Sequence, residues 1–485
     1  MKIKLYDHLN KQFGYDMFRI GQEEVITSVL EGKHTLAVLP TGTGKSLCYQ
    51  LPGYLLKGIV IIVSPLLSLM QDQVEQLKIN GEKRVTALNS FLESKERKQI
   101  IHSLQNYRFI YTSPEMLTNN EILQKLKQME ISLFVVDEAH CISQWGPDFR
   151  PDYLNLSMIR SELKNPTTLA LTATATEDVR ADIIKHLNLD NVNQLIYSVD
   201  RPNIALVVEE TTNYNDKVNK LLQFVKQLQK PGIIYFSSKR LTEEMAALLR
   251  NNGIAQTAAY HGGMDREQRI LIQQQFLHNQ LQVICATSAF GMGVNKENIR
   301  FVIHFHMPYQ LDSYLQEIGR AGRDGKKSIA VLLYSPGDEF LPLQIFENEL
   351  PSDDQIEQFF LLNKNSNEES LLNLTEIQLR FLTYYQKKYE RSEVAKRVKR
   401  IRDFRIQYKQ KKLNEMVKWV KSTTCRREGI LRYFQEQKVT NVKDCCDVCG
   451  VHIENYQTYI PENVKGQNEN WQLLLKNLLI RGDEK

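Results

Sequence analysis

Short apolar runs that each end in a polar motif recur through the first two thirds of the chain, and they constrain its fold more than any other feature. Five lie between residues 35 and 176, and four more follow between residues 232 and 334. Segments with helical periodicity separate them. Strands that are buried on both faces and joined by helices form a doubly wound parallel sheet, with functional side chains at the carboxyl ends of the strands. The pattern therefore predicts two α/β domains in series.

A phosphate-binding loop follows the first of these runs, between a predicted strand and a predicted helix. Its glycines let backbone amides turn inward around phosphate oxygens, its lysine reaches the β- and γ-phosphates, and its serine hydroxyl binds Mg²⁺. Leu39 occupies the position where the general pattern has its first glycine, so Gly42 must supply the flexibility. The candidate nucleotide ligands are Thr41, Gly42, Thr43, Gly44, Lys45 and Ser46.

Two adjacent carboxylates, Asp137 and Glu138, end another apolar run and should stand at the carboxyl end of a strand. One carboxylate can hold Mg²⁺ through water while its neighbour orients or deprotonates the attacking water. The loop that follows at once carries side chains suited to stacking on nucleic-acid bases, which predicts a motor. Core packing is the alternative for its aromatic residues, and Gly146 and Pro147 between them favour a loop. The candidate nucleic-acid ligands are His140, Gln144, Trp145, Phe149 and Arg150.

The second predicted domain contains no Gly-Lys-Ser, but the segment that begins at Gln316 carries Arg320 and Arg323. Two arginines three residues apart on a helix lie on one face, and a guanidinium fork suits a phosphate whose negative charge is shifting. Such an arginine can contribute about 10³ to 10⁵ in rate. Hydrolysis would then require the two domains to close. The alternative is a pair of surface arginines in salt bridges.

A basic segment follows the second predicted domain. Between Lys387 and Arg427 the chain has sixteen lysines and arginines but four acidic residues, although its overall net charge is only +5. A basic face on a mildly acidic body is typical of a localised phosphate-binding surface, and the alternative is a solvated helix without a partner. From about residue 342 to the cysteine cluster the sequence is helical and polar, without strand-like runs.

Four of the seven cysteines gather near the end of the chain. The first residues lack the apolar core of a secretion signal, and no run approaches about 18 apolar residues. We therefore expect a cytoplasmic protein that spans no membrane and keeps its thiols reduced, which favours Zn²⁺ over disulfides. Cys445 and Cys446 are adjacent, and if only one can face the metal, His452 would replace the other. The candidate zinc ligands are Cys425, Cys445, Cys446 and Cys449.

The length of 485 residues exceeds what one hydrophobic core supports, because cores stop growing near about 250 to 300 residues. We expect an α/β protein in which two doubly wound parallel-sheet domains precede a helical zinc-binding domain. The expected limits are 1–207 for the nucleotide-binding domain, 208–342 for the second α/β domain, 343–455 for the helical, basic and zinc-binding domain, and 456–485 for a tail.

The chain resembles the RecQ helicases of superfamily 2 over roughly residues 5 to 450. The resemblance rests on eight motifs in family order, and eight matches in sequence are very specific. The matching segments are residues 18–22, 39–50, 64–73, 137–146, 171–176, 260–264, 289–296 and 316–325.

This resemblance implies two RecA-like domains and an ATP-dependent DNA helicase that moves 3′ to 5′ on one strand, unwinding forked, overhang or recombination-intermediate DNA. ATP, Mg²⁺ and Zn²⁺ would be its cofactors. Arg19 and Gln22 would recognise adenine, and residues 140–153 would couple DNA binding to hydrolysis. We expect a nucleoid-associated monomer whose partners are single-stranded and branched DNA, with single-stranded-DNA-binding protein as a further partner.

The sequence departs from the family in two ways that bear on DNA binding. About a hundred residues, including the basic segment, separate Arg323 from Cys425. Only 36 residues follow Cys449, too few for the winged-helix and small helical domains of larger members, so we expect a short form. The basic helices at 387–421 would partly replace the winged helix in holding duplex DNA.

The sequence is also compatible with two other functions. The Asp-Glu-Ala-His motif at 137–140 also occurs in RNA helicases, although the aromatic-rich loop favours DNA. A DNA-annealing or scaffold protein with a regulatory ATPase is the non-enzymatic alternative. Intact Lys45, Glu138 and Arg323 argue against it, because an inactive motor has no need of all three.

Overall fold

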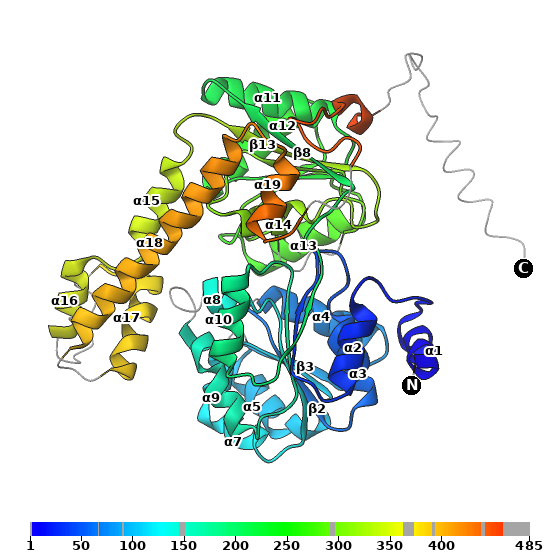
Figure 1. Ribbon diagram of the computed structural model, residues 1–485, viewed down its shortest axis with the longest axis vertical. Coiled ribbons are helices and arrows are strands. Elements are labelled where there is room, and N and C mark those ends of the chain that lie inside the picture. The colour runs from blue at the N-terminus through cyan, green and yellow to red at the C-terminus, as the bar shows by residue number, and fades with distance from the viewer. Residues whose placement is uncertain are drawn as a thin grey trace, which may run out of the picture.

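The computed structural model describes residues 2–65, 67–89, 92–144, 151–291, 296–361, 373–389, 393–437 and 442–458. Two parallel sheets form separate domains, which lie one above the other in Figure 1, and a helical region runs along one side of both. The predicted pair of α/β domains followed by helices is confirmed. None of the described helices is both long and apolar enough to cross a membrane.

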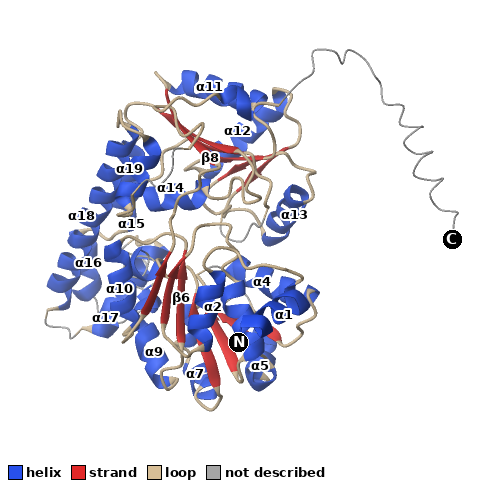
Figure 2. Ribbon diagram, turned by 45° about the vertical axis from the view of Figure 1, so that its right-hand side comes forward, coloured by secondary structure: helices blue, strands red, loops and turns tan. Residues whose placement is uncertain are grey.

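The first domain is built on a seven-stranded parallel sheet with the order β3-β4-β2-β5-β6-β1-β7. Helices flank the strands (Figure 2), and β2 (Ile59–Val63) is buried at every residue, as a strand covered on both faces must be. The other strands are β1 (Thr35–Val38), β3 (Val85–Leu88), β4 (Phe109–Thr112), β5 (Ile131–Val136), β6 (Thr168–Thr172) and β7 (Asn193–Ile196). The helices are α1 (Lys2–Phe13), α2 (Gln22–Leu30), α3 (Leu47–Leu55), α4 (Leu67–Ile79), α5 (Ser94–His102), α6 (Pro114–Leu117), α7 (Asn120–Leu126), α8 (Cys141–Gln144), α9 (Leu156–Glu162) and α10 (Glu177–Leu187).

The second domain contains a six-stranded parallel sheet with the order β10-β11-β9-β12-β13-β8. Its strands are β8 (Ile204–Glu210), β9 (Gly232–Tyr235), β10 (Thr257–Tyr260), β11 (Val283–Ala286), β12 (Phe301–His304) and β13 (Ser328–Tyr334). Its helices are α11 (Tyr214–Gln227), α12 (Lys239–Asn251), α13 (Arg266–Leu277) and α14 (Leu311–Ile318).

The helical region has two parts that share one long helix, α18 (Val394–Val420), whose 27 residues span about 40 Å. Its first half packs with α16 (Asp353–Leu361) and α17 (Glu376–Lys388) around a small core of its own. Its last two turns instead join the core of the second domain. The remaining helices are α15 (Phe340–Glu349) and α19 (Arg426–Tyr433).

None of the three expected domain limits coincides with the packed elements, and the limit between residues 342 and 343 falls inside α15 (Phe340–Glu349). The limit between residues 207 and 208 falls inside β8, which pairs with β13 of the second sheet from Ile204 onward. Tyr456, where we expected the tail to begin, is buried in the core of the second domain. We therefore propose that the first domain ends before Ile204 and that the packed chain extends at least to residue 458. The helix expected near 471–479 lies outside the described residues.

Candidate active site

A cavity of about 310 Å³ opens between the two α/β domains. The phosphate-binding loop lies between β1 and α3, and the carboxylate pair follows β5, so both reach the cavity from the carboxyl ends of strands. Thr43 is the one candidate nucleotide ligand that does not line it, and its hydroxyl donates to the Pro40 carbonyl at 2.8 Å. The candidates that line the cavity are Arg19, Gln22, Thr41, Gly42, Gly44, Lys45, Ser46, Asp137, Glu138, Gln316, Arg320 and Arg323.

The phosphate-binding loop depends on two glycines with left-handed backbone conformations. Gly42 has φ 88° and Gly44 has φ 71°, values that residues with a Cβ rarely adopt. A Cβ at Gly42 would also lie 3.0 Å from the Arg323 side chain of the other domain. Gly42 therefore supplies the flexibility predicted for it, although Leu39 stands where the general pattern has glycine.

The two residues expected to recognise adenine bond to this loop. The Gln22 amide donates to the Thr43 carbonyl at 2.6 Å, and Arg19 donates to the Gly42 carbonyl at 2.7 Å. Tyr15 and Met17 also line the cavity and are largely exposed. Sequence reasoning missed this pair, because no spacing pattern distinguishes them from other residues in a loop.

Burial and the neighbouring Glu138 carboxylate raise the pKa of Asp137 to about 7. Two carboxylates that share a buried site repel each other, and a bound dication relieves that repulsion. Glu138 has φ 49°, a conformation that costs energy for a residue with a side chain and is found preferentially at functional sites. The pair thus fits a Mg²⁺ ion.

His140 links the carboxylate pair to the second domain. Burial lowers the pKa of its imidazole, so the ring is neutral. The Gln316 amide nitrogen lies 3.1 Å from Nε2, and since an amide nitrogen can only donate, Nε2 accepts and the proton resides on Nδ1. Nδ1 lies 2.9 Å from the hydroxyl of Thr172, which itself donates to a backbone carbonyl. One direction of hydrogen bonding is therefore set across the domain interface.

Two guanidinium groups of the second domain, those of Arg320 and Arg323, line the cavity together with the phosphate-binding loop. Burial, together with the charges of Arg320 and Arg201, lowers the pKa of Arg323 to about 9. Arg320 is itself buried and lines the cavity with Arg323. Cations that destabilise one another in a buried cleft are stabilised by an anion, so the arrangement fits a polyphosphate.

Arg201 closes the domain interface, and sequence reasoning used its segment only as a domain border. Its guanidinium donates to the carbonyls of Thr41 at 2.8 Å and Gly322 at 2.7 Å, which belong to different domains. Gly319 abuts the phosphate-binding loop so closely that a Cβ there would lie 1.9 Å from the Thr41 hydroxyl oxygen. The two domains therefore meet at the phosphate end of the cavity.

The predicted nucleic-acid loop is only partly described. His140 is buried at the start of this segment, and α8 ends at Gln144. Trp145, Phe149 and Arg150 lie outside the described residues. The chain is described again from Pro151, where a 3₁₀ turn (Pro151–Asn155) contacts α17 of the helical region.

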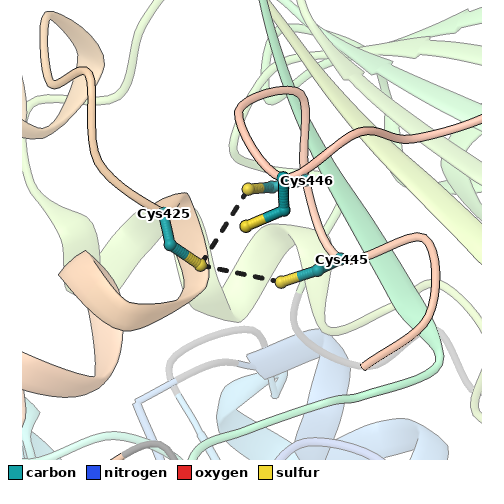
Figure 3. Close-up of side chains that lie close together, drawn as sticks. Cys425, Cys445 and Cys446 are labelled. Atoms are coloured by element: carbon teal, nitrogen blue, oxygen red, sulfur yellow. Dashed lines mark hydrogen bonds between the residues drawn. The ribbon is translucent and has the colours of Figure 1, made fainter. Parts of the chain in front are cut away.

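The four predicted zinc ligands come together at the edge of the second domain. Their Sγ atoms all lie within 4.8 Å of one another, and His452 is not a member of the group. Figure 3 shows Cys425 facing its partners, with its Sγ 3.7 Å from Cys445 and 4.0 Å from Cys446. Tetrahedral zinc with Zn–S bonds of about 2.3 Å separates its sulfurs by roughly 3.8 Å. The thiols therefore fit Zn²⁺, and the adjacent pair does not prevent convergence.

The residues that follow Cys425 attach this cluster to the rest of the molecule. Arg426 donates to three carbonyls at the end of α18, those of Trp419, Val420 and Ser422. Arg427 pairs with Asp200 and donates to the Arg201 carbonyl at the interdomain hinge. Beyond α19, Glu436 accepts from the Val199 amide at 3.0 Å. The segment 425–449, which we call the zinc module, thus contacts both α/β domains and the segment between them.

Models of three protein families match the chain in order. They are the DEAD/DEAH box helicase family over residues 19–182, the helicase conserved C-terminal domain over 216–325 and the RecQ zinc-binding family over 387–450. The probable ATP-dependent DNA helicase RecS of Bacillus subtilis is 44% identical over 464 residues, which make up 94% of this chain and 93% of RecS. The ATP-dependent DNA helicase RecQ of Haemophilus influenzae is 38% identical over 91% of this chain, which spans only 62% of that RecQ.

Solved helicases share the fold at low identity. Mycobacterium smegmatis Lhr, bound to single-stranded DNA and AMP-PNP, gives a TM-score of 0.57 at 21% identity over 67% of this chain and 47% of Lhr. Mss116, bound to single-stranded RNA, gives 0.59 at 16% identity over 84% of this chain and 90% of Mss116. The fold alone therefore does not choose the nucleic acid. The zinc-binding model and the RecS match identify the family, whose cofactors are ATP, Mg²⁺ and Zn²⁺, and the chain belongs to the RecQ family of ATP-dependent DNA helicases.

Proposed function

We propose that this protein hydrolyses ATP to move 3′ to 5′ along single-stranded DNA and thereby unwinds forked, overhang or recombination-intermediate DNA. The observation that carries the proposal is the shared cavity, in which the phosphate-binding loop of one domain faces the paired arginines of the other. Neither domain has a complete site alone. A site completed by closure can convert each hydrolysis event into a relative domain movement.

Each side chain has a role that follows from its position. Lys45 would hold the β- and γ-phosphates, while Ser46 and Asp137 would hold Mg²⁺, which supplies charge neutralisation during phosphoryl transfer. Glu138 would orient and deprotonate the attacking water. Arg320 and Arg323 would stabilise the charge that develops on the γ-phosphate. Gln316 would report the state of the site to His140, which lies 3.1 Å away.

The nucleic-acid side of the proposal rests on the loop that follows α8. Stacking of a base on an aromatic side chain contributes about 1 to 3 kcal/mol, comparable to the mean of about 1.4 kcal/mol per step of duplex DNA. One aromatic wedge can therefore offset about one base pair, and opening many pairs requires repeated ATP cycles. Trp145, Phe149, Arg150 and Gln144 are the residues we propose for this contact.

We further propose that the protein acts as a monomer at the nucleoid, with single-stranded-DNA-binding protein as a partner in addition to single-stranded and branched DNA. The support is family membership alone. Sedimentation of the pure protein, with and without a forked oligonucleotide, would test the monomer, and pull-down with purified single-stranded-DNA-binding protein would test the partner.

The deciding experiment measures steady-state ATP hydrolysis without nucleic acid and with single-stranded DNA, duplex DNA or single-stranded RNA. We expect strong stimulation by single-stranded DNA in the wild type and its loss in Trp145→Ala. Tyr107→Ala serves as the control for removal of an aromatic side chain elsewhere in the first domain. Equal stimulation by RNA would favour an RNA helicase, and hydrolysis that ignores nucleic acid would favour a scaffold with a regulatory ATPase.

A further inference from the structure

Helix α14 carries polar side chains that face two different parts of the protein. Gln316 contacts His140 of the first domain and also lines the nucleotide cavity. Arg320 lines the same cavity but lies in the turn after α14, which ends at Ile318, and not on a helix as the sequence predicted. Asp312, one turn before Gln316, is 1% exposed and accepts a hydrogen bond from the Tyr433 hydroxyl at 2.5 Å. A single rigid helix therefore joins the ATP site to α19 of the zinc module.

Asp312 is also the end of a ladder of alternating cations and aromatic rings. Lys412 of α18 donates to the Tyr433 hydroxyl, and its ammonium lies 4.6 Å from the Tyr433 ring centroid. The same ammonium lies 5.6 Å from the ring centroid of Tyr408. The guanidinium of Arg405, which precedes Tyr408 along α18, lies 4.8 Å from the same centroid. Cations held near aromatic faces at these distances are attracted to them.

The far end of the ladder reaches the segment between His140 and the nucleic-acid loop. Arg405 is 6% exposed, and its guanidinium lies 3.5 Å from the carbonyl oxygen of Ser143 in α8. Because α8 begins directly after His140, both ends of the ladder return to that histidine: one through α8, and the other through α14 and Gln316. The contacts form a closed circuit through both α/β domains and α18.

The chemistry of the ladder exceeds what packing of α18 requires. Lys412 is 8% exposed, and its ammonium lies 4.0 Å from the Asp312 carboxylate and 3.9 Å from that of Glu415. Taking such an ion pair out of water is costly. Apolar residues would join the same helices at less cost. Burial and the adjacent Asp312 carboxylate raise the pKa of the Tyr433 phenol, so Tyr433 remains a hydrogen-bond donor. A buried, directional network of this kind fixes one relative position of its helices.

We propose that Asp312, Tyr433 and Lys412 are positioning residues. Through Tyr408 and Arg405 they hold α14 in register with α8. DNA bound at the loop after α8 then sets the Gln316–His140 contact and with it the rate of ATP hydrolysis. The inference rests on the proposed function, because it concerns how DNA stimulates hydrolysis. It assigns that role to a set of residues that do not line the nucleotide cavity.

Conservative variants of the full-length protein test the ladder: Asp312→Asn, Tyr433→Phe, Lys412→Met and Tyr408→Leu. We expect kcat at saturating single-stranded DNA to fall about tenfold, while the DNA-free rate and the KM for ATP change less than about twofold. The matched control is Asp353→Asn. It removes a carboxylate that pairs with Lys399 and Arg402 in the first half of α18 and that contacts no ladder residue, and it should leave stimulation intact.

A double-mutant cycle separates coupling from general damage. Asp312→Asn and Tyr433→Phe should be strongly non-additive in DNA-stimulated kcat, because each removes the same contact. If single-stranded DNA stimulates ATP hydrolysis as strongly in the ladder variants as in the wild type, the role of the ladder is refuted while the proposed function stands. Equal losses with and without DNA, or additive losses, would reduce the residues to structural ones and overturn the inference. A wild-type rate indifferent to DNA would refute the proposed function and the ladder with it.

Discussion

Arg201 shows how much one side chain at the hinge can do. Its guanidinium donates to carbonyls of Thr41 and Gly319 through one nitrogen, and to those of Ala321 and Gly322 through another. A charge-assisted hydrogen bond is roughly twice as strong as a neutral one, and a planar fork meets several acceptors at fixed angles. Arg201 therefore holds the phosphate-binding loop of the first domain against residues 319–322 of the second domain.

We predict that Arg201→Lys lowers kcat for ATP hydrolysis about tenfold, because a single ammonium cannot keep the four carbonyl contacts that the two guanidinium nitrogens make. Steady-state hydrolysis at saturating ATP measures the effect. Arg108→Lys is the matched control, since Arg108 also donates to two carbonyls, Gly53 and Tyr54, but within the first domain. A wild-type kcat in Arg201→Lys would show that closure does not depend on this contact.

At the scale of single elements, not all of the positive charge of α18 is available to bind DNA. Several of its cations serve internal contacts: Lys399 binds Glu357, Arg402 binds Asp353, and Lys409 binds Glu349 at 2.6 Å. The exposed cations without a described ion pair fall on one face of the helix. They are Lys396, Arg400, Lys411 and Lys418.

We predict that charge reversal of these four residues weakens single-stranded and forked DNA binding and reduces the slope of log affinity against log salt concentration. Each lost phosphate contact should lower the slope by about 0.7 on single strands and 0.9 on duplex. The control reverses four exposed lysines of the first domain: Lys83, Lys95, Lys98 and Lys164. Fluorescence anisotropy titrations at several salt concentrations measure both; an unchanged slope in the α18 variant would exclude this face as a DNA grip.

The sheets and the phosphate-binding loop could be predicted from the sequence, but the ion pairs of α18 could not. Apolar runs predicted both sheets because burial on two faces leaves a local signature, and the phosphate-binding loop was visible because its glycines are contiguous. The internal pairs of α18 were not, since their acids lie 42 to 60 residues away in sequence. Arg201 was missed for a second reason: its acceptors are backbone carbonyls, which every residue has and which no sequence pattern marks.

At the scale of the whole molecule, the zinc cluster is joined to the hinge by consecutive residues. Cys425 belongs to the cluster, Arg426 caps α18, and Arg427 binds the hinge. Metal binding that exists only in the folded state contributes directly to folding free energy. Loss of zinc should therefore loosen the contact between the domains as well as the loop that holds the metal.

We predict that Cys425→Ser abolishes bound zinc and lowers the unfolding temperature by at least about 5 °C. Elemental analysis and differential scanning calorimetry measure the two effects. Cys285→Ser is the control for loss of a buried thiol, because Cys285 lies in β11 outside the cluster and its variant should keep one zinc per chain. Full zinc content in Cys425→Ser would remove this residue from the ligand set.

The pairing at β8 also has a consequence for how the protein is made. β8 is the last strand in its sheet, and its outer edge is covered where Leu206 bridges Cys446 and accepts from the Asp447 amide. A ribosome adding about 5 to 20 residues per second needs roughly 10 to 50 seconds to make the intervening chain. During that time a nascent molecule presents an uncovered strand edge, which is a template for aggregation. The segment around Cys446 therefore covers the exposed edge of β8 only late in synthesis, when aggregation through that edge has already been possible for several seconds.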